Sequence, residues 1–162
     1  YYILYIIYFV IIYTIMTLYK TQIIQFIVMT LVGIAFNPMN ILAFRFSDLY
    51  LSTTLVYGGF LMASNMIWAH ELVHYFSMGH FNKYLFGVGV VLSVAVSVLL
   101  LRTQLLIDDN QWLRRMISHH STALTTSHNI HYKSTNPTIK KLAKDIIETQ
   151  EREIKLMKSL LN

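Results

Sequence analysis

Two stretches of the sequence carry histidines at spacings that support metal chemistry. The first, residues 69–80, reads AHELVHYFSMGH and places His70, Glu71 and His74 in the order H-E-x-x-H. On a helix, His70 and His74 would share a face, with Glu71 beside them. Two imidazoles can then hold zinc while the carboxylate takes a proton from bound water, which is the arrangement of zinc peptidases.

Several parts of such a peptidase are missing. His80 has the spacing of the third zinc ligand of one peptidase class, but Ser77 stands where that class requires glycine. No later Glu or Asp suits the third-ligand position of intramembrane zinc peptidases, and the FNPMN segment, residues 36–40, lacks the aspartate that those enzymes place after a similar motif. Because short patterns arise by chance, the match alone carries little weight.

Two other interpretations of His70, Glu71 and His74 stay open. They can be polar groups at a helix end near a membrane interface, where Trp68 and Tyr75 would also be favourable. They can also form a second metal site, for example for zinc, or a haem site with His70 or His74 as an axial ligand. Ionisable groups in an apolar segment are costly, so they are functional candidates by default.

The second stretch lies near the C-terminus and mixes imidazole with thioether groups. Met116, His119 and His120 fall within about one helical turn. Glu153 and Met157 follow on a later segment at a spacing that also shares a helix face. Thioether with imidazole favours copper, particularly in its reduced state, whereas carboxylate with imidazole also accepts zinc or iron. The chain has no cysteine, so thiolate ligands and disulfides are excluded.

The segments that must position these C-terminal groups are helical in pattern. Residues 88–128 contain no Pro and, beyond Gly89, no Gly, which predicts one helix of about 40 residues continuing out of an apolar span. The HYKSTNPT segment then breaks the chain, with Pro137 near the first position of the next helix. Residues 138–161 carry apolar side chains on one stripe and are predicted to be amphipathic.

The two C-terminal helices are predicted to form a hairpin, because each has an apolar face that needs a partner. A hairpin alone buries little surface, so we expect a second copy to pack against it and complete a four-helix bundle. This arrangement would bring the sulfur and imidazole groups into a shared interior.

Composition places the rest of the chain in a membrane. Of 162 residues, 55% are hydrophobic and 13% charged, against about a quarter charged in soluble domains. Residues 1–101 hold three basic and two acidic residues, and residues 102–162 hold ten and six. We therefore predict a transmembrane region, 1–101, and a soluble helical domain, 102–162. The spread of charge shows no nucleic-acid footprint.

Four apolar segments are long enough to test as spans against the roughly 20 residues that a bilayer requires. They are Tyr1–Tyr19, Gln22–Phe44, Leu49–Met78 and Tyr84–Leu101. Four spans are expected, with three as the alternative if the first two segments form one long helix. Pro38 must kink or end the helix that contains it. Orientation stays open, because Lys20 and Lys83 compete with the basic tail.

The C-terminal sequence resembles the family called domain of unknown function three-hundred-and-five, DUF305. Its pattern is Met-Ile-Pro-His-His-x-x-Ala on one helix and Ala-x-x-Ile-Ile-x-x-Gln-x-x-Glu-Ile-x-x-Met on the next. The matching residues here are Met116, Ile117, His119, His120, Ala123, Ala143, Ile146, Ile147, Gln150, Glu153, Ile154 and Met157. Arg102–Gln104 also resembles a juxtamembrane R-x-Q of membrane-anchored members.

The resemblance implies a ferritin-like hairpin after several spans. Some periplasmic members of the family bind copper through Met and His. Ser118 departs from the usual Pro, and Thr126 departs from a Met that many members carry six residues after the second His. The resemblance assigns no role to His128 or His131, but either imidazole could replace that missing ligand.

These observations predict an all-α integral membrane protein with a ferritin-like helical hairpin that pairs into a four-helix bundle. Its expected function is copper binding through Met116, His119, His120, Glu153 and Met157, with zinc or haem as less favoured cofactors and without enzymatic activity. The alternatives are a structural or accessory subunit of a larger membrane assembly and the zinc protease. The expected partners are the lipid bilayer and further copies or subunits.

Overall fold

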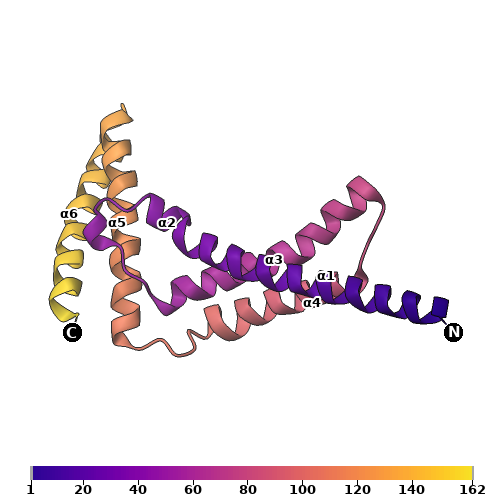
Figure 1. The fold of residues 1–162 in the computed structure, drawn as a ribbon. Coiled ribbons are helices and arrows are strands. Elements are labelled where there is room, and N and C mark those ends of the chain that lie inside the picture. Colours follow the sequence, from indigo (N-terminus) through magenta and orange to yellow (C-terminus); the bar gives the residue numbers. More distant parts are fainter. Residues whose placement is uncertain (1, 162) are drawn as a thin grey trace. The chain divides into compact units, whose positions relative to one another are not determined.

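The computed structural model describes the backbone of residues 2–161 and the side chains of Met16 and residues 19–161. Within these residues the chain forms helices and no strand (Figure 1). The long helices are α1 (Tyr2–Ala35), α3 (Thr53–Met78), α4 (Lys83–Ala95), α5 (Asp109–Lys133) and α6 (Pro137–Leu160). Shorter pieces are α2 (Pro38–Ile41), the 3₁₀ turn η1 (Phe46–Asp48) and η2 (Val96–Arg102), which is π-helical. The all-α prediction is confirmed.

The N-terminal segment is one continuous helix. The sequence left open whether residues 18–21 form a turn, and α1 runs through them to Ala35. The expectation of two separate spans there is therefore wrong, because no Pro or Gly interrupts the helix before Gly33. Pro38 ends it as predicted: α2 starts at this proline, and the Asn37 side chain accepts the Asn40 N–H at 3.1 Å.

The helices belong to two compact units. The first contains Tyr1–Gly33 and Gly59–Ser97, and the second contains Ile34–Gly58 and Val98–Asn162. In the first unit, the Phe26 and Phe60 rings stack at 6.1 Å between α1 and α3. The helices α3 and α4 approach so closely that a Cβ on Gly89 would lie 2.7 Å from the Trp68 nitrogen. Glycine is therefore needed at this crossing.

Among the residues whose side chains are described, two segments are long and apolar enough to cross a membrane, Tyr19–Ile41 and Lys83–Arg102. They correspond to the second and fourth predicted spans. The third predicted span forms α3, which is not among them because the polar residues near its C-terminal end, including His70, Glu71 and His74, lower its hydropathy. The side chains of the first predicted span, Tyr1–Tyr19, lie largely outside the described residues.

The single helix predicted over residues 88–128 is wrong. The chain leaves helical geometry after Arg102, and Gln104 and Leu106 have φ angles of 53° and 56°. Helix α5 starts anew at Asp109, where the Asp108 carboxylate accepts the Gln111 N–H at 2.8 Å. Asp is a favoured N-cap, so this local signal overrides the continuous helix propensity around it.

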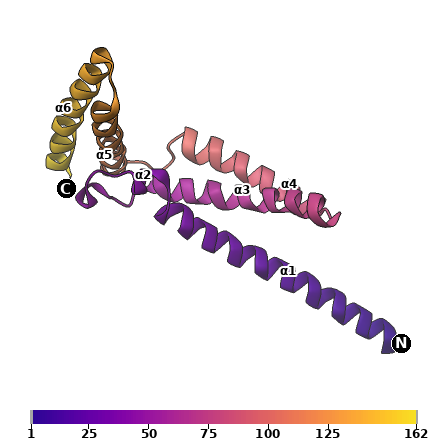
Figure 2. The same ribbon diagram turned by 90° about the horizontal axis from the view of Figure 1, so that it is seen from above.

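The second unit contains the predicted hairpin. Helices α5 and α6 lie side by side and antiparallel in both views (Figures 1 and 2). The Asn136 side chain caps α6 through the Thr138 N–H at 2.9 Å, and Pro137 opens the helix as predicted. The buried core between the helices contains Leu113, Ile117, Leu124, Ile154 and Met157. The amphipathic stripes therefore pair as the sequence indicates.

A second face of α5 is covered by the chain's own residues. The Ser118 hydroxyl donates to the Asp48 carbonyl at 2.8 Å, and the Ser121 hydroxyl donates to the Asp48 carboxylate at 2.7 Å. The other Asp48 oxygen accepts from Lys158 on α6 at 2.5 Å. The segment around Asp48 is thus anchored to both helices of the hairpin. A single chain contributes two helices and this segment, and the four-helix bundle stays a prediction.

Candidate metal centre

The hairpin contains a His–carboxylate pair that joins its two helices. The His120 Nε2 lies 2.9 Å from Glu153 Oε2, and its Nδ1 lies 2.8 Å from the Met116 carbonyl oxygen. A carbonyl can only accept, so Nδ1 carries a proton. Nε2, which faces Glu153, is therefore the nitrogen that a metal ion would bind, and the contact with the carbonyl fixes the orientation of the ring.

Two thioethers flank this pair on the same side of each helix. Met116 lies one turn before His120 on α5, and Met157 lies one turn after Glu153 on α6. Because α5 and α6 are antiparallel, one turn back along α5 and one turn forward along α6 both lead away from the hairpin loop. Met116 and Met157 therefore lie at the same level of the hairpin. Met157 is buried in the core, and Met116 is half-buried against it. The hairpin thus places four of the five predicted ligands within one turn of the His120–Glu153 contact: Met116, His120, Glu153 and Met157.

His119 lies on a different side of α5. It is an exposed residue, and its ring centroid is 5.9 Å from that of His120. Desolvation lowers the pKa of His119, and the nearby charges of His120 and Arg115 lower it further. The imidazole is therefore more readily neutral near neutral pH, which is the form that binds metals.

The other histidines of the hairpin are engaged elsewhere. The His128 ring stacks on Phe44 with centroids 4.8 Å apart. His131 Nδ1 lies 2.9 Å from the Lys140 carbonyl oxygen near the hairpin loop. Whether either ring replaces the ligand that Thr126 removes stays a prediction. Among the described residues, no three His, Asp or Glu side chains are already grouped as a metal site.

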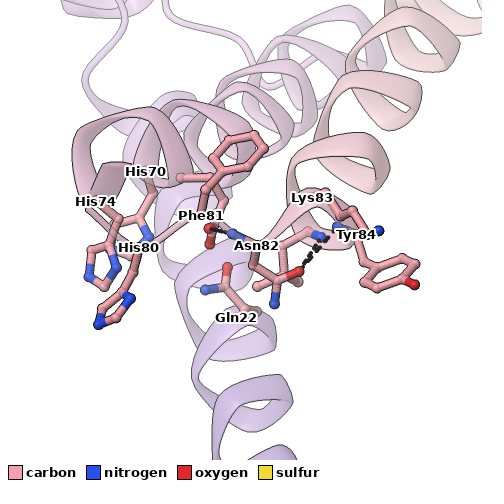
Figure 3. A pocket seen from close by; sticks show the side chains of 10 residues that line it. Gln22, His70, His74, His80, Phe81, Asn82, Lys83 and Tyr84 are labelled. Atoms are coloured by element: carbon pink, nitrogen blue, oxygen red, sulfur yellow. Dashed lines mark hydrogen bonds between the residues drawn. The ribbon is translucent and has the colours of Figure 1, made fainter. Parts of the chain in front are cut away.

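The first histidine stretch lines a cavity of about 550 Å³ in the first unit. His70 and His74 share one face of α3, as predicted, with ring centroids 4.9 Å apart. His80, from the turn after α3, also lines the cavity, and Figure 3 shows its ring beside that of His74. The His70 Nδ1 is buried and has no hydrogen-bond partner.

Glu71 has a structural contact that the zinc-protease hypothesis does not include. Its side chain is buried, and Oε2 accepts the backbone N–H of Asn82 at 3.0 Å. Asn82 in turn caps α4, since its side-chain oxygen accepts the Tyr84 N–H at 3.1 Å. The carboxylate therefore links the end of α3 to the start of α4.

Sequence reasoning missed Gln22, which reaches the same cavity from α1. Its residue surface is buried, and its Oε1 has no hydrogen-bond partner (Figure 3). An amide within an otherwise apolar segment was the available signal. Its place in the same cavity as His70 depends on the packing of α1 with the other helices, which one sequence does not give.

Comparison with known proteins identifies relatives whose roles are not described. The model of the family described as domain of unknown function DUF305 matches residues 102–161. The chain is also similar to the uncharacterized protein L153 of Acanthamoeba polyphaga mimivirus, with 33% identity over 143 residues, which cover 88% of this chain and 93% of the relative. No solved structure matches the chain.

Proposed function

The chain belongs to the DUF305 family, and from this premise we propose that it is a membrane-anchored protein that binds reduced copper in the α5–α6 hairpin. The proposed ligands are Met116, His120, Glu153 and Met157. His119 is the fifth ligand that the sequence predicts. Its side chain would have to change conformation to bind the same ion as the other four residues.

One observation carries the proposal: the two helices meet at the His120–Glu153 contact of 2.9 Å, one turn away from the two methionines. His120 and Glu153 are more than thirty residues apart in the sequence, so local sequence alone does not bring them together. A packing role would explain the two methionines. It does not require the half-exposed Glu153 carboxylate to lie beside His120, whose Nδ1 is already held by the Met116 carbonyl.

The chemistry of the donor set fits copper. A metal ion would bind His120 through Nε2, in place of its contact with Glu153, and the methionines offer neutral, polarisable sulfur, which soft ions such as reduced copper prefer. Glu153 adds a charge that would partly neutralise the ion. Bound copper would supply a soft cation held within the hairpin, and no catalytic step is assigned to it.

Membrane anchoring is supported by the way that the two candidate spans begin. Gln22 lies near the start of one span, and Lys83 and Tyr84 lie at the start of the other, yet all three line the same cavity. Because both spans begin at this cavity, they would start from the same side of the membrane. The chain between them must therefore cross back to that side. Helix α3 has 26 residues, about 39 Å at the α-helical rise, which exceeds the roughly 30 Å of hydrocarbon. We therefore propose three spans.

The four-helix bundle would form when two hairpins associate. Leu142 and Leu156 on α6 are 59% and 58% exposed in the single chain, so an apolar surface remains available. A second copy would cover it, as the bundle architecture requires.

Copper retention by the purified full-length chain tests the proposal. We expect the wild-type chain in mild detergent to retain copper against a copper(I) chelator under reducing conditions. Met116→Leu combined with Met157→Leu should abolish this retention while preserving the fold, because Leu and Met have similar volumes. Met78→Leu is the matched control, since Met78 lies outside the hairpin and is exposed.

The same experiment separates copper binding from the alternative of a purely structural or accessory subunit. A structural hairpin would retain no copper in the wild-type chain. Retention that the two hairpin substitutions leave unchanged would likewise contradict the proposed site.

A further inference from the structure

We propose that His70, His74 and His80 form a second metal site, which takes a borderline divalent ion such as Zn²⁺. It lies in the cavity of the first unit and is independent of the hairpin site. Its three donors are imidazoles, whereas the hairpin combines one imidazole with thioethers and a carboxylate. The two donor sets therefore favour different ions.

His70 and His74 supply the preformed half of this site. They are one turn apart on α3, and their rings lie 4.9 Å apart at a tilt of 33°. His70 Nδ1 is buried without a hydrogen-bond partner. An unpaired buried nitrogen costs free energy unless something binds it, and a metal ion in the cavity would satisfy it.

His80 supplies the movable half. It lies on an exposed turn directly after Gly79, whose φ angle of 71° reverses the chain beyond α3. The contact between Glu71 and the Asn82 N–H holds the far side of this turn. Glu71 is thus a positioning residue here, since it fixes the segment that carries the third imidazole and is not itself a ligand.

The cavity also leaves room for a non-protein ligand. Gln22 Oε1 is a buried acceptor without a partner, and Gln22 lines the same cavity as the histidines. A metal-bound water could donate a hydrogen bond to this oxygen. Three imidazoles and one water make the four-coordinate shell that zinc commonly adopts.

The three rings do not yet converge on one point, since no such metal-binding group is formed among the described side chains. His80 is the group that must move, and its exposure permits a rotation of the side chain without repacking the core. Metal binding should therefore order this turn.

Co²⁺ titration of the full-length chain in detergent tests the site, because tetrahedral Co²⁺ has a visible absorption band and replaces zinc. The parent protein carries His120→Ala, which removes the hairpin imidazole. We expect it to bind Co²⁺ at a single site with a tetrahedral spectrum. His74→Ala and His80→Ala should each weaken binding by about a hundredfold or more, beyond the 10–100-fold typical of supporting residues.

Two further variants make the result specific. His131→Ala removes an imidazole near the hairpin loop and should leave binding unchanged. Glu71→Gln keeps an oxygen that can accept the Asn82 N–H, so it should also preserve binding. Because His80 is exposed, its replacement does not threaten the fold, and circular dichroism of each variant verifies this.

The proposal is overturned if the parent protein binds no Co²⁺ or if His74→Ala and His80→Ala bind it as tightly as the parent. Loss of binding in a folded Glu71→Gln protein would also overturn it, because Glu71 would then be a ligand. None of these outcomes changes the copper result for the hairpin, so the two proposals fail separately.

Discussion

Replacing Lys158 by Met tests how the hairpin holds the segment around Asp48. Asp48 is 0% exposed, and its carboxylate accepts from Lys158 and Ser121. Lys158→Met leaves this charge buried and removes one of the two hydrogen bonds to it described above. Breaking a buried ion pair from one side typically costs about 3–5 kcal/mol. Arg45 also interacts with the carboxylate, so we expect about 3 kcal/mol, at the lower end of that range.

Thermal unfolding followed by far-ultraviolet circular dichroism measures this effect. At about 2–4 °C per kcal/mol for a chain of this size, Tm should fall by roughly 6–12 °C. The matched control is Lys155→Met, an exposed position on the same helix, where we expect less than about 0.5 kcal/mol. Adding Asp48→Asn to Lys158→Met should recover part of the loss, since it removes the unpaired charge.

The reasoning is refuted if Lys158→Met and Lys155→Met lower Tm equally. It is also refuted if Asp48→Asn worsens the Lys158→Met protein, because the buried charge would then not be the cause.

Three further predictions concern pH, packing and topology. The pKa of His119 is below its ordinary value of 6.5, so the unfolded chain binds this proton more readily than the folded chain. The free energy of unfolding should therefore fall as the pH drops through 6.5. Denaturant titrations should show a weaker pH dependence of this free energy in His119→Gln, and a dependence identical to that of the wild type contradicts the assignment. Leu124 is 0% exposed in the hairpin core, so Leu124→Ala should cost about 2–5 kcal/mol by denaturant unfolding, whereas a cost near zero would mean that this core is not formed. The chain has no cysteine, so single cysteines at Phe46→Cys and Ser77→Cys can be labelled selectively. With α3 crossing the membrane between them, they should react from opposite sides of a sealed vesicle, and labelling from the same side rules out three spans.

The sequence predicted the hairpin well because its signals are local. Asn136 and Pro137 mark a helix start by their own chemistry, and the apolar stripes on both sides of this turn can only be buried against each other. The pairing of His120 with Glu153 follows from that turn, because the loop length sets which residues of the two helices face each other.

The break before α5 was missed although Asp108 is a common capping residue. Helix-favouring residues on both sides outweighed this single local signal. Gln104 and Leu106 adopt left-handed conformations, but neither is a glycine, the residue that would have predicted such a conformation. The contact between Asp48 and Lys158 could not be predicted from the sequence either, since the two residues are 110 positions apart in the chain. Contacts over such separations depend on tertiary packing and leave no periodic pattern in one sequence.

X-ray absorption at the copper edge tests the central claim most directly. The sample is the full-length chain carrying His74→Ala, which disables the second site, loaded with less than one equivalent of reduced copper. Because the chain contains no cysteine, any sulfur bound to the copper must come from methionine. We predict a shell that contains both sulfur and imidazole nitrogen and that loses its sulfur in the Met116→Leu, Met157→Leu protein. Copper surrounded only by nitrogen and oxygen, or sulfur that survives both substitutions, would contradict the proposed centre.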